Sequence, residues 1–318
     1  MSIIRNPVAL IAALTACLTL AAASPVLAQE ADRVFHLADP EGGEIEAGVW
    51  LPAGAEDGEP RPLVVISHGN GGWYRGHHDT AKALAEAGFV VAALTHPGDN
   101  WQDDSRATQL SDRPRHISLL IDHMVGEGAR FATIDPDRIG AFGFSAGGFT
   151  VTALAGGISD PARIRRHCEE QPAFFACRLF AQQPIDASGW RPRGHDTRVK
   201  AAVIAGPALG LAFTDESLAA IRIPIQLWQA AEDEILPAPF NVEPVRDRLG
   251  RPPEYHRVTG AMHYDFLPPC APEMMAALPV LCHSKPGFDR AAFHRMFNRE
   301  VVRFFRDAFG PGLPFTPR

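Results

Sequence analysis

Hydrophobic residues gather in short continuous runs along this 318-residue chain, and longer segments of mixed polarity lie between the runs. A continuous apolar run of about four to eight residues is typical of a strand buried on both faces of a sheet. Such runs predict strands at 62–67, 89–94, 137–144, 200–206 and 223–228, and the stretch "EYHRVTG" at 254–260 is strand-like. Before them, the runs at 34–37 and 47–51 flank the turn-rich "ADPEGGEIE" and predict an entry hairpin.

Several segments between the runs have the periodicity of helices. Apolar spacing predicts helices at 80–87, directly before Gly88, and at 117–124. A last helix is predicted at about 290–309, where a row of phenylalanines is most simply a packing face. The alternation of strands and helices predicts one α/β domain with a mostly parallel sheet covered by helices.

One long segment interrupts this alternation. Residues 158–197 form a connection that is too long for an ordinary loop and too rich in aromatic residues for a linker. We expect this insertion to form a small cap, and caps of this kind lie over clefts.

The first 28 residues have the pattern of a secretory signal peptide. Arg5 precedes an apolar run at 7–23, and Val26-Leu27-Ala28 is an A-x-A-like cleavage site. We therefore expect an exported protein, periplasmic or secreted, whose mature domain is 29–318. Two alternatives stay open: a bacterial lipobox at Leu14-Thr15-Ala16-Cys17, which would attach a lipidated Cys17 to the membrane, or an uncleaved anchor.

The cysteines fit an oxidising compartment. Cys17 lies in the predicted signal, and the four others could form two bridges. Three pairings are possible, and sequence proximity favours Cys168 with Cys177 and Cys270 with Cys282. Four buried free thiols are the alternative.

Charge and ligand spacing exclude two kinds of partner. The formal net charge is −7 and the chain has no basic stripe, so a nucleic-acid partner is not expected. His77, His78 and Asp79 form a metal-like cluster, but adjacent histidines diverge in direction, so we predict no metal site there.

The stretch "IGAFGFSAGGF" at 139–149 places one serine among glycines. A nucleophilic serine stands on a strained turn from a strand to a helix, where side chains two positions away on either side would clash. Gly143 and Gly147 occupy those positions around Ser145, and the helix-compatible "AGGFTVTALA" follows. We predict that Ser145 is a catalytic nucleophile; a glycine-rich packing turn is the alternative.

A serine nucleophile needs a histidine base, and the base needs a carboxylate that orients it. In hydrolases with this kind of turn, the acid and then the histidine follow the serine along the chain. Asp233 comes after the strand at 223–228, and His263 comes after "EYHRVTG", so we predict these two as acid and base. Glu232 and Glu234 flank Asp233 and stay open as the acid.

The oxyanion of such a reaction needs backbone amide donors. The loop "ISHGNGG" at 66–72 ends the first buried strand, and its glycines allow the backbone to approach a substrate closely. We predict the amides of Asn70 and Ala146 as the oxyanion hole, a role for which Asn70 need not use its side chain; a tight strand-to-helix loop is the alternative.

The blocks "SHGNGG", "GFSAGG", "AAEDEILP" and "GAMHYDFLPPC" resemble those of the α/β-hydrolase superfamily. More narrowly, they are similar to serine esterases of the dienelactone-hydrolase-like and platelet-activating-factor-acetylhydrolase-like groups. The resemblance covers about 34–310 and implies an α/β-hydrolase fold that cleaves small-molecule or lipid-like esters without a cofactor. True dienelactone hydrolases use cysteine where this chain has Ser145, so the resemblance does not imply their substrate.

Two other functions stay open. A peptidase or amidase of the prolyl-oligopeptidase type would use the same three residues, although no propeller accompanies them here. A non-catalytic binding protein on the same scaffold would normally lack at least one of the three.

For some residues near the predicted cleft, two interpretations stay open. His96 and Asp99 follow the strand at 89–94 and could contact substrate or lie in a solvated loop. An acyl pocket or ordinary packing could each explain four aromatic residues, namely Trp73, Tyr74, Trp101 and Trp190.

Overall fold

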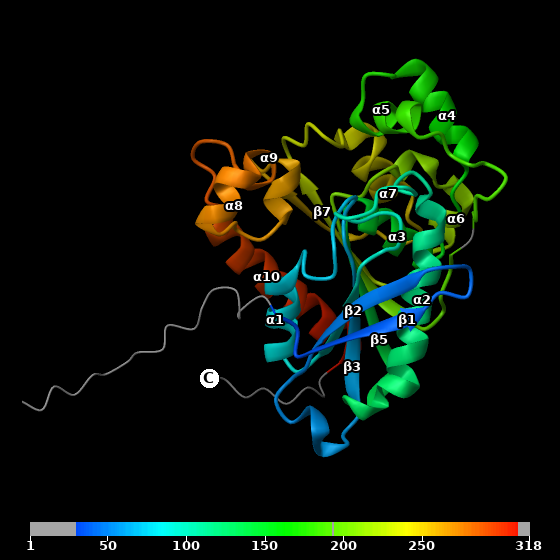
Figure 1. Cartoon of the computed structure of the whole chain (residues 1–318). Helices are drawn as coiled ribbons and strands as arrows, with labels where there is room; N and C mark the ends of the chain where they lie inside the picture. Colours follow the sequence, from blue (N-terminus) through cyan, green and yellow to red (C-terminus); the bar gives the residue numbers. More distant parts are fainter. Residues whose placement is uncertain (1–29, 193, 311–318) are drawn as a thin grey trace, which may run out of the picture.

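The computed structural model describes residues 30–192 and 194–310, which form an eight-stranded sheet with helices on both faces (Figure 1). The strands are β1 (Arg33–Ala38), β2 (Glu44–Trp50), β3 (Arg61–Ser67), β4 (Val90–Leu94), β5 (Ile134–Phe144), β6 (Val199–Ala205), β7 (Ile225–Ala230) and β8 (Glu254–Val258). Their order across the sheet is β1-β2-β4-β3-β5-β6-β7-β8.

The direction of the strands decides where a site can form. Strands β3 to β8 are parallel to one another, whereas β2 is antiparallel to β4 and forms the predicted entry hairpin with β1. The carboxyl ends of the parallel strands therefore meet at one edge, which is where open α/β sheets bind ligands.

Helices cover the two faces of the sheet. They are α1 (His78–Glu86), α2 (Arg113–Val125), α3 (Ala146–Leu154), α4 (Pro161–Glu170), α5 (Phe175–Gln182), α6 (Asp215–Ala220), α7 (Val242–Arg248), α8 (Pro272–Ala277), α9 (Pro279–Cys282) and α10 (Arg290–Phe309). Helices α1 and α10 lie on one face, and α2, α3, α6 and α7 lie on the other (Figure 1).

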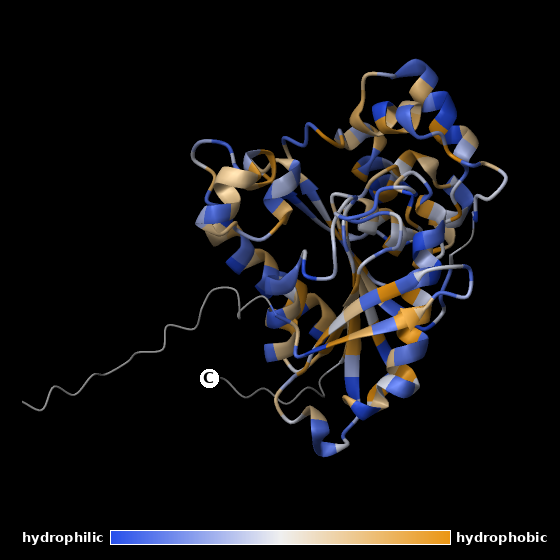
Figure 2. Ribbon diagram, viewed as in Figure 1, coloured by the Kyte–Doolittle hydropathy of each residue, from blue (hydrophilic) through white to orange (hydrophobic). Residues whose placement is uncertain are grey.

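Strand β3 shows why a continuous apolar run fits the middle of this sheet. Leu63 and Val65 pack under α2 and α3, while Val64 and Ile66 pack under α1 and α10, and all four are at most 2% exposed. Each buried aliphatic side chain contributes roughly 1.5–3 kcal/mol. The hydrophobic strands between more polar helix surfaces are visible in Figure 2, and the prediction of a strand buried on both faces is confirmed.

Some element boundaries differ from the prediction. Helix α2 begins at Arg113, four residues before the predicted start, because Pro114 suits a first helical turn and the Arg113 side chain is buried among polar partners. Helix α10 spans the predicted 290–309. The short helices α6 to α9 were not predicted, because stretches of four to seven residues carry too few apolar repeats.

The insertion predicted at 158–197 contains α4 and α5. Gln183 at the end of α5 binds Thr108 and the Ser105 carbonyl in the loop after β4. His167 of α4 packs its ring on Phe240, which lies in the short helix η6 (Ala238–Phe240) after β7. The insertion thus bridges loops from the carboxyl edge of the sheet.

Two disulfides join Cys168 to Cys177 and Cys270 to Cys282, the pairing that sequence proximity favours. The first links α4 to α5, and the second closes a loop of 12 residues that contains α8. Within 30–192 and 194–310, no helix has the length and apolar character needed to cross a membrane. The predicted signal peptide at 1–28, with Cys17, lies outside the described residues.

Candidate active site

Ser145 lies between the end of β5 and the start of α3, at the carboxyl edge of the sheet. Its backbone has φ 57° and ψ −118°, a strained conformation for a residue with a side chain. The Ser145 amide donates to the Ala205 carbonyl at 3.0 Å, and its carbonyl accepts from the Ala208 amide at 2.9 Å. Neighbouring backbone therefore holds the strained turn on both sides.

Glycines make this turn possible through close packing. A Cβ at Gly147 would lie 1.9 Å from the Ser67 carbonyl oxygen, and one at Gly143 would lie 2.1 Å from the Gly147 carbonyl oxygen. No real Cβ fits at such distances, so both positions require glycine. Side chains would clash at Gly143 and at Gly147, as the sequence predicted.

His263 lies between Ser145 and Asp233. Its Nε2 is 3.0 Å from Ser145 Oγ, and its Nδ1 is 2.8 Å from Asp233 Oδ2. The other carboxylate oxygen of Asp233 accepts from the amides of Ile235 at 3.1 Å and Leu236 at 2.7 Å. The turn after β7 thus fixes the carboxylate, and the carboxylate fixes the imidazole with Nε2 facing the hydroxyl.

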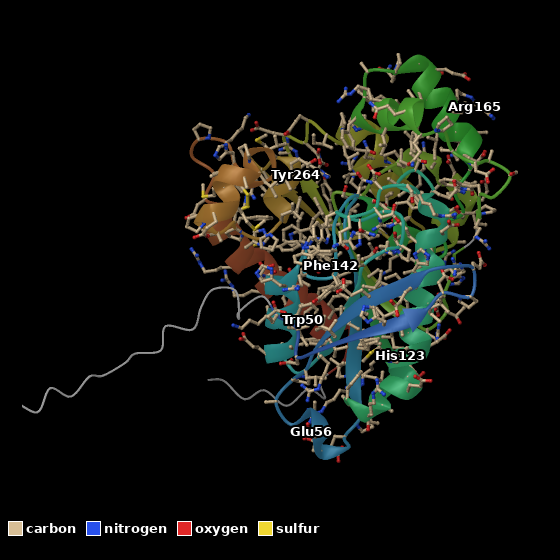
Figure 3. The ribbon with its side chains drawn as sticks, viewed as in Figure 1. Trp50, Glu56, His123, Phe142, Arg165 and Tyr264 are labelled. Carbon is tan, nitrogen blue, oxygen red and sulfur yellow. A yellow bond between two sulfur atoms is a disulfide. The ribbon has the colours of Figure 1, made fainter. Side chains whose placement is uncertain are left out.

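Two aromatic rings contact the imidazole. The Phe144 ring centroid lies 4.8 Å from that of His263, and the Tyr264 centroid lies 5.2 Å from it. Burial raises the pKa of the Tyr264 hydroxyl, and the nearby carboxylates of Asp233 and Glu234 add to the effect. In Figure 3 the labelled Tyr264 marks the carboxyl edge of the sheet, and Glu56 marks the opposite end of the molecule.

The neighbouring acids point elsewhere. Glu232 forms an ion pair with Lys285, and both it and Glu234 are exposed. The structure therefore brings Asp233, rather than either of the two glutamates left open by the sequence, to the histidine.

The turn that carries His263 is the short helix η7 (His263–Phe266), and a buried ion pair anchors it. The fully buried Asp265 accepts from Arg290 Nε at 3.0 Å and from the Met262 amide at 2.8 Å. Its carbonyl lies 2.9 Å from His294 Nε2 on α10. Sequence reasoning missed this anchor because its partners are about 25 residues apart and share no motif.

The predicted oxyanion loop lies against the serine. A Cβ at Gly69 would be 3.2 Å from Ser145 Cβ, so the chain from Gly69 to Asn70 passes directly beside Ser145. Ala146 is the first residue of α3, where backbone amides have no partner within the helix and the helix dipole favours negative charge.

A buried polar cluster lies behind this loop, and it corrects the solvated-loop interpretation of His96 and Asp99. Asp99 is only 2% exposed and forms an ion pair with Arg113. His96 is fully buried, with Nε2 2.9 Å from Ser67 Oγ and Nδ1 3.1 Å from His116 Nδ1. Both residues bind the loop after β3 from its buried side, so direct substrate contact is not their role in this structure.

Burial keeps the histidines of this cluster neutral. It holds the pKa of His68 and of His96 well below the ordinary value, and the Arg113 charge adds to the effect. Burial lowers the pKa of His116 to about 4, helped by Arg115. Neutral rings can both donate and accept, which suits a hydrogen-bonded support.

The four aromatic residues divide into two groups. Tyr74 and Trp190 are buried and pack against Trp50 and Phe149, so packing is their role. The ring centroids of Trp73 and Trp101 lie 6.0 Å apart beside the predicted oxyanion loop, and Trp101 is 62% exposed.

The metal-like cluster is split between two surroundings. His77 is buried against the rings of Phe142 and Phe144, whereas Asp79 pairs with His294 of α10 at 2.7 Å. Across the described part of the chain, no group of three or more histidine, cysteine, aspartate or glutamate side chains is arranged to hold a metal ion.

Comparison with known proteins agrees with this fold. No family model matches the chain. It is 30% identical over 141 residues to "Putative esterase NocK" of Nocardia uniformis subsp. tsuyamanensis, a match that covers 43% of this chain and only 37% of that protein.

Solved structures are similar over most of the chain. A ferulic acid esterase from Streptomyces cinnamoneus has a TM-score of 0.56 at 18% identity and covers 86% of this chain and 87% of its own. Thermogutta terrifontis esterase 2 with bound butyrate gives 0.53 at 15% identity, covering 85% and 94%. A puromycin-hydrolyzing peptidase of Mycobacterium tuberculosis gives 0.56 at 16% identity, covering 90% of this chain and 40% of that one.

The sheet order and these likenesses define an α/β-hydrolase fold, as the sequence predicted. At these identities the solved structures establish the fold and not the reaction. A narrower membership among dienelactone-hydrolase-like or platelet-activating-factor-acetylhydrolase-like proteins stays a prediction.

Proposed function

We propose that this protein is a serine hydrolase that cleaves carboxylic esters through an acyl-enzyme intermediate. The observation that carries the proposal is the position of His263, within hydrogen-bond distance of both Ser145 Oγ and Asp233 Oδ2. Serine hydrolases need this relay, because a serine hydroxyl is a weak nucleophile until a base removes its proton.

The chemistry follows from the atoms at hand. As Ser145 Oγ attacks the ester carbonyl, its proton moves to His263 Nε2, while His263 Nδ1–H donates to Asp233 and stabilises the imidazolium. The amides of Asn70 and Ala146 donate to the oxyanion of the tetrahedral intermediate. His263 then protonates the leaving alkoxide, and a water molecule, activated in the same way, releases the acyl group.

The names of the relatives favour esters as the substrate. The Nocardia relative and the Streptomyces and Thermogutta structures are named as esterases, and the Thermogutta protein was solved with butyrate bound. We propose a small-molecule or lipid-like ester, with no cofactor.

The test is the loss of activity on replacing the nucleophile. We expect Ser145→Ala to lower kcat on p-nitrophenyl esters by at least about 10⁴-fold, because the acyl-enzyme can no longer form. Ser188→Ala, at an exposed hydroxyl in the insertion, is the matched control and should leave kcat unchanged. Near-full activity of a folded Ser145→Ala protein would contradict the proposal.

A peptidase is the second candidate, favoured by the likeness to the puromycin-hydrolyzing enzyme. The same three residues could cleave amides, which have a poorer leaving group. Parallel assays with an ester and the matching anilide distinguish the two: we expect kcat/KM for the ester to exceed that for the anilide by orders of magnitude. A protein that neither hydrolyses nor reacts with an active-site phosphonate would instead be a binding module.

We also propose export of the chain, with 1–28 removed and 158–197 acting as a cap over the site. Two disulfides fit an oxidising compartment, since they rarely persist in the cytosol. The intact mass of the protein secreted by a bacterial host should correspond to a start near Gln29. A mass that includes a lipid on Cys17 would instead identify a lipoprotein.

A further inference from the structure

The buried ion pair of Asp99 and Arg113 lies between the two segments that carry the proposed oxyanion donors. The Arg113 side chain is 2% exposed and that of Asp99 is 3% exposed. Neither side chain has a part in the proton relay. A buried pair is weak evidence for stability, because removing two charges from water costs about as much as their attraction returns. Its hydrogen bonds suggest another role.

Asp99 holds the loop after β3. Its Oδ1 accepts from Asn70 Nδ2 at 2.8 Å and from the Gly71 amide at 3.0 Å. One bond holds the Asn70 side chain, and the other holds the amide of the Asn70–Gly71 peptide. They limit rotation of the backbone at Asn70, the residue whose amide faces the reacting carbonyl in the proposed mechanism.

Arg113 holds the same loop and the start of α3. Its Nη2 donates to the His68 carbonyl, and its Nε donates to Thr150 Oγ1 at 3.1 Å. The Thr150 hydroxyl in turn donates to the Ala146 carbonyl at 3.0 Å. Through Thr150, the guanidinium is therefore connected to the other proposed donor residue.

These two segments also touch directly. Gly147 of α3 packs on the Ser67 carbonyl so closely that a Cβ would lie 1.9 Å from that oxygen. This contact sets the distance between the loop after β3 and the start of α3. It does not set the rotation of the peptide at Asn70, which depends on the side-chain bonds to Asp99.

We propose that Asp99 and Arg113 are positioning residues that align the amides of Asn70 and Ala146 toward one oxyanion. In this arrangement Asp99 orients the loop through its hydrogen bond to the Asn70 side chain. The inference rests on the proposed serine-hydrolase function. A displacement of about 1 Å at such a site can cost about 100-fold in rate, so the pair has a catalytic effect without touching the substrate.

The first test uses Asn70→Ala, which removes the side-chain hydrogen bond to Asp99 and keeps the backbone amide. We expect kcat on a p-nitrophenyl ester to fall about 10- to 100-fold with KM within about twofold, the signature of an interaction made in the transition state. Asp99→Asn should give a fall of the same order. Because both changes act on one contact, the double variant should be no slower than the slower single variant, within about threefold.

The second test addresses the link from Arg113 through Thr150 to Ala146. Thr150→Val keeps the shape of the side chain and removes the hydroxyl between Arg113 and the Ala146 carbonyl. We expect kcat to fall about 3- to 10-fold, again without a change in KM. Affinity for an alkyl boronic acid, which forms a tetrahedral adduct on serine, should fall in parallel with kcat/KM in each variant.

Asp135→Asn is the matched control for loss of a paired carboxylate. Asp135 pairs with Arg138 at 2.6 Å and accepts from the Asp137 amide at 3.0 Å, near the start of β5 and away from the oxyanion loop. We expect it to lower the melting temperature and leave kcat within about twofold.

Failure of this positioning role can be distinguished from failure of the proposed hydrolase function. An inactive, unlabelled wild-type protein would refute the hydrolase itself. With an active wild type, unchanged kcat in Asn70→Ala or multiplicative effects in the double variant would overturn the positioning role. If Asp99→Asn does not fold, Asn70→Ala and Thr150→Val still decide: unchanged kcat in either variant overturns the inference, and a fall in both supports it.

Discussion

The strained backbone of Ser145 is possible because of residues that lack a side chain. With φ at 57°, the turn lifts the hydroxyl above the end of β5, and Gly143 and Gly147 allow the chain to pass within contact of Ser67. Strain of this kind costs about 1–3 kcal/mol and persists only where the surrounding structure fixes it. Here the fixing bonds come from Ala205 and Ala208, at the end of β6 and just after it.

At Asp233 the identity of the acid can be tested by comparing neighbours. We expect Asp233→Asn to lower kcat about 10³- to 10⁴-fold, because the amide would favour the wrong tautomer of His263. Glu232→Gln should stay within about twofold, since Glu232 pairs with Lys285 at the surface. Steady-state kinetics on one ester measure both. Equal effects of the two substitutions would show that the acid was assigned wrongly.

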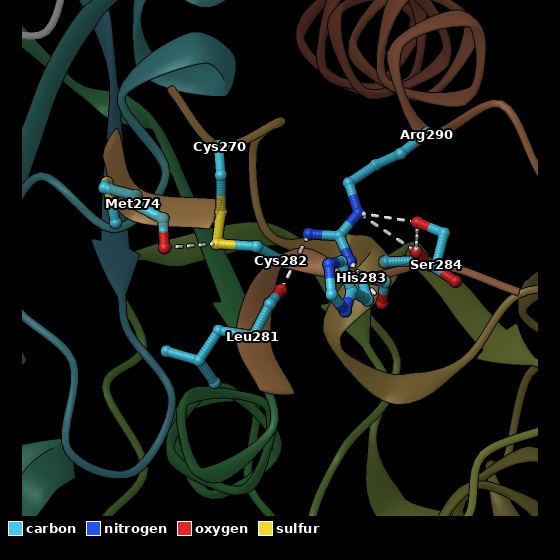
Figure 4. The surroundings of a disulfide bond; sticks show 8 residues. Cys270, Met274, Leu281, Cys282, His283, Ser284 and Arg290 are labelled. Atoms are coloured by element: carbon cyan, nitrogen blue, oxygen red, sulfur yellow. Dashed lines mark hydrogen bonds and ion pairs between the residues drawn. A yellow bond between two sulfur atoms is a disulfide. The ribbon is translucent and has the colours of Figure 1, made fainter. Parts of the chain in front are cut away.

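Among the elements, the loop that carries His263 depends on a disulfide and an arginine. Figure 4 shows Arg290 beside the Cys270–Cys282 bond, donating to the Leu281 carbonyl at 2.8 Å and the His283 carbonyl at 3.2 Å. The same guanidinium pairs with Asp265 in η7. The disulfide loop and the turn that carries His263 therefore share one anchor.

Removing this disulfide should change catalysis as well as stability. We expect Cys270→Ala with Cys282→Ala to cost about 2–3 kcal/mol of unfolding free energy and about tenfold in kcat. The control is Cys168→Ala with Cys177→Ala in the insertion, which should cost similar stability and leave kcat within about twofold. Denaturant titrations and kinetics on the two double variants give the comparison. A fall in kcat that is equal in both would contradict a specific link to His263.

How far the sequence could predict these elements depended on the range of the interactions involved. The buried strands and the turn at Ser145 are local patterns, so apolar runs and glycine spacing sufficed. Asp99 meets Asn70 from 29 residues away, across the loops after β3 and β4, and it meets Arg113 from 14 residues away, where α2 begins after the loop that carries Asp99. Nothing in the local sequence marks such pairs, so the sequence alone leaves Asp99 as a substrate contact or as part of a solvated loop.

On the scale of the whole molecule, buried neutral histidines make stability depend on pH. Burial lowers the pKa of His77 to about 3, outweighing the nearby Asp79. His116, at about 4, behaves similarly. The folded state leaves these rings unprotonated below pH 6.5, while the unfolded chain binds protons there, so stability is retained above that pH and lost as the pH falls toward 4.

We expect the free energy of unfolding to fall by roughly 2–3 kcal/mol for each of these two histidines between pH 6.5 and pH 4.5. His77→Leu provides the matched variant, because neither ring nitrogen of His77 has a hydrogen-bond partner among the described residues and its neighbours are aromatic. Denaturant titrations at the two pH values should show a smaller loss in the variant. An equal loss in both proteins would contradict this origin of the acid sensitivity.

The most direct measurement for the whole molecule is covalent labelling of the native protein with a fluorophosphonate, followed by peptide mass spectrometry. We expect one phosphonyl group per chain, on Ser145, and no labelling after heat unfolding, because only the folded sheet brings His263 to the hydroxyl. A folded protein that takes no label, or takes it on another serine while Ser145 stays unmodified, would contradict the central claim.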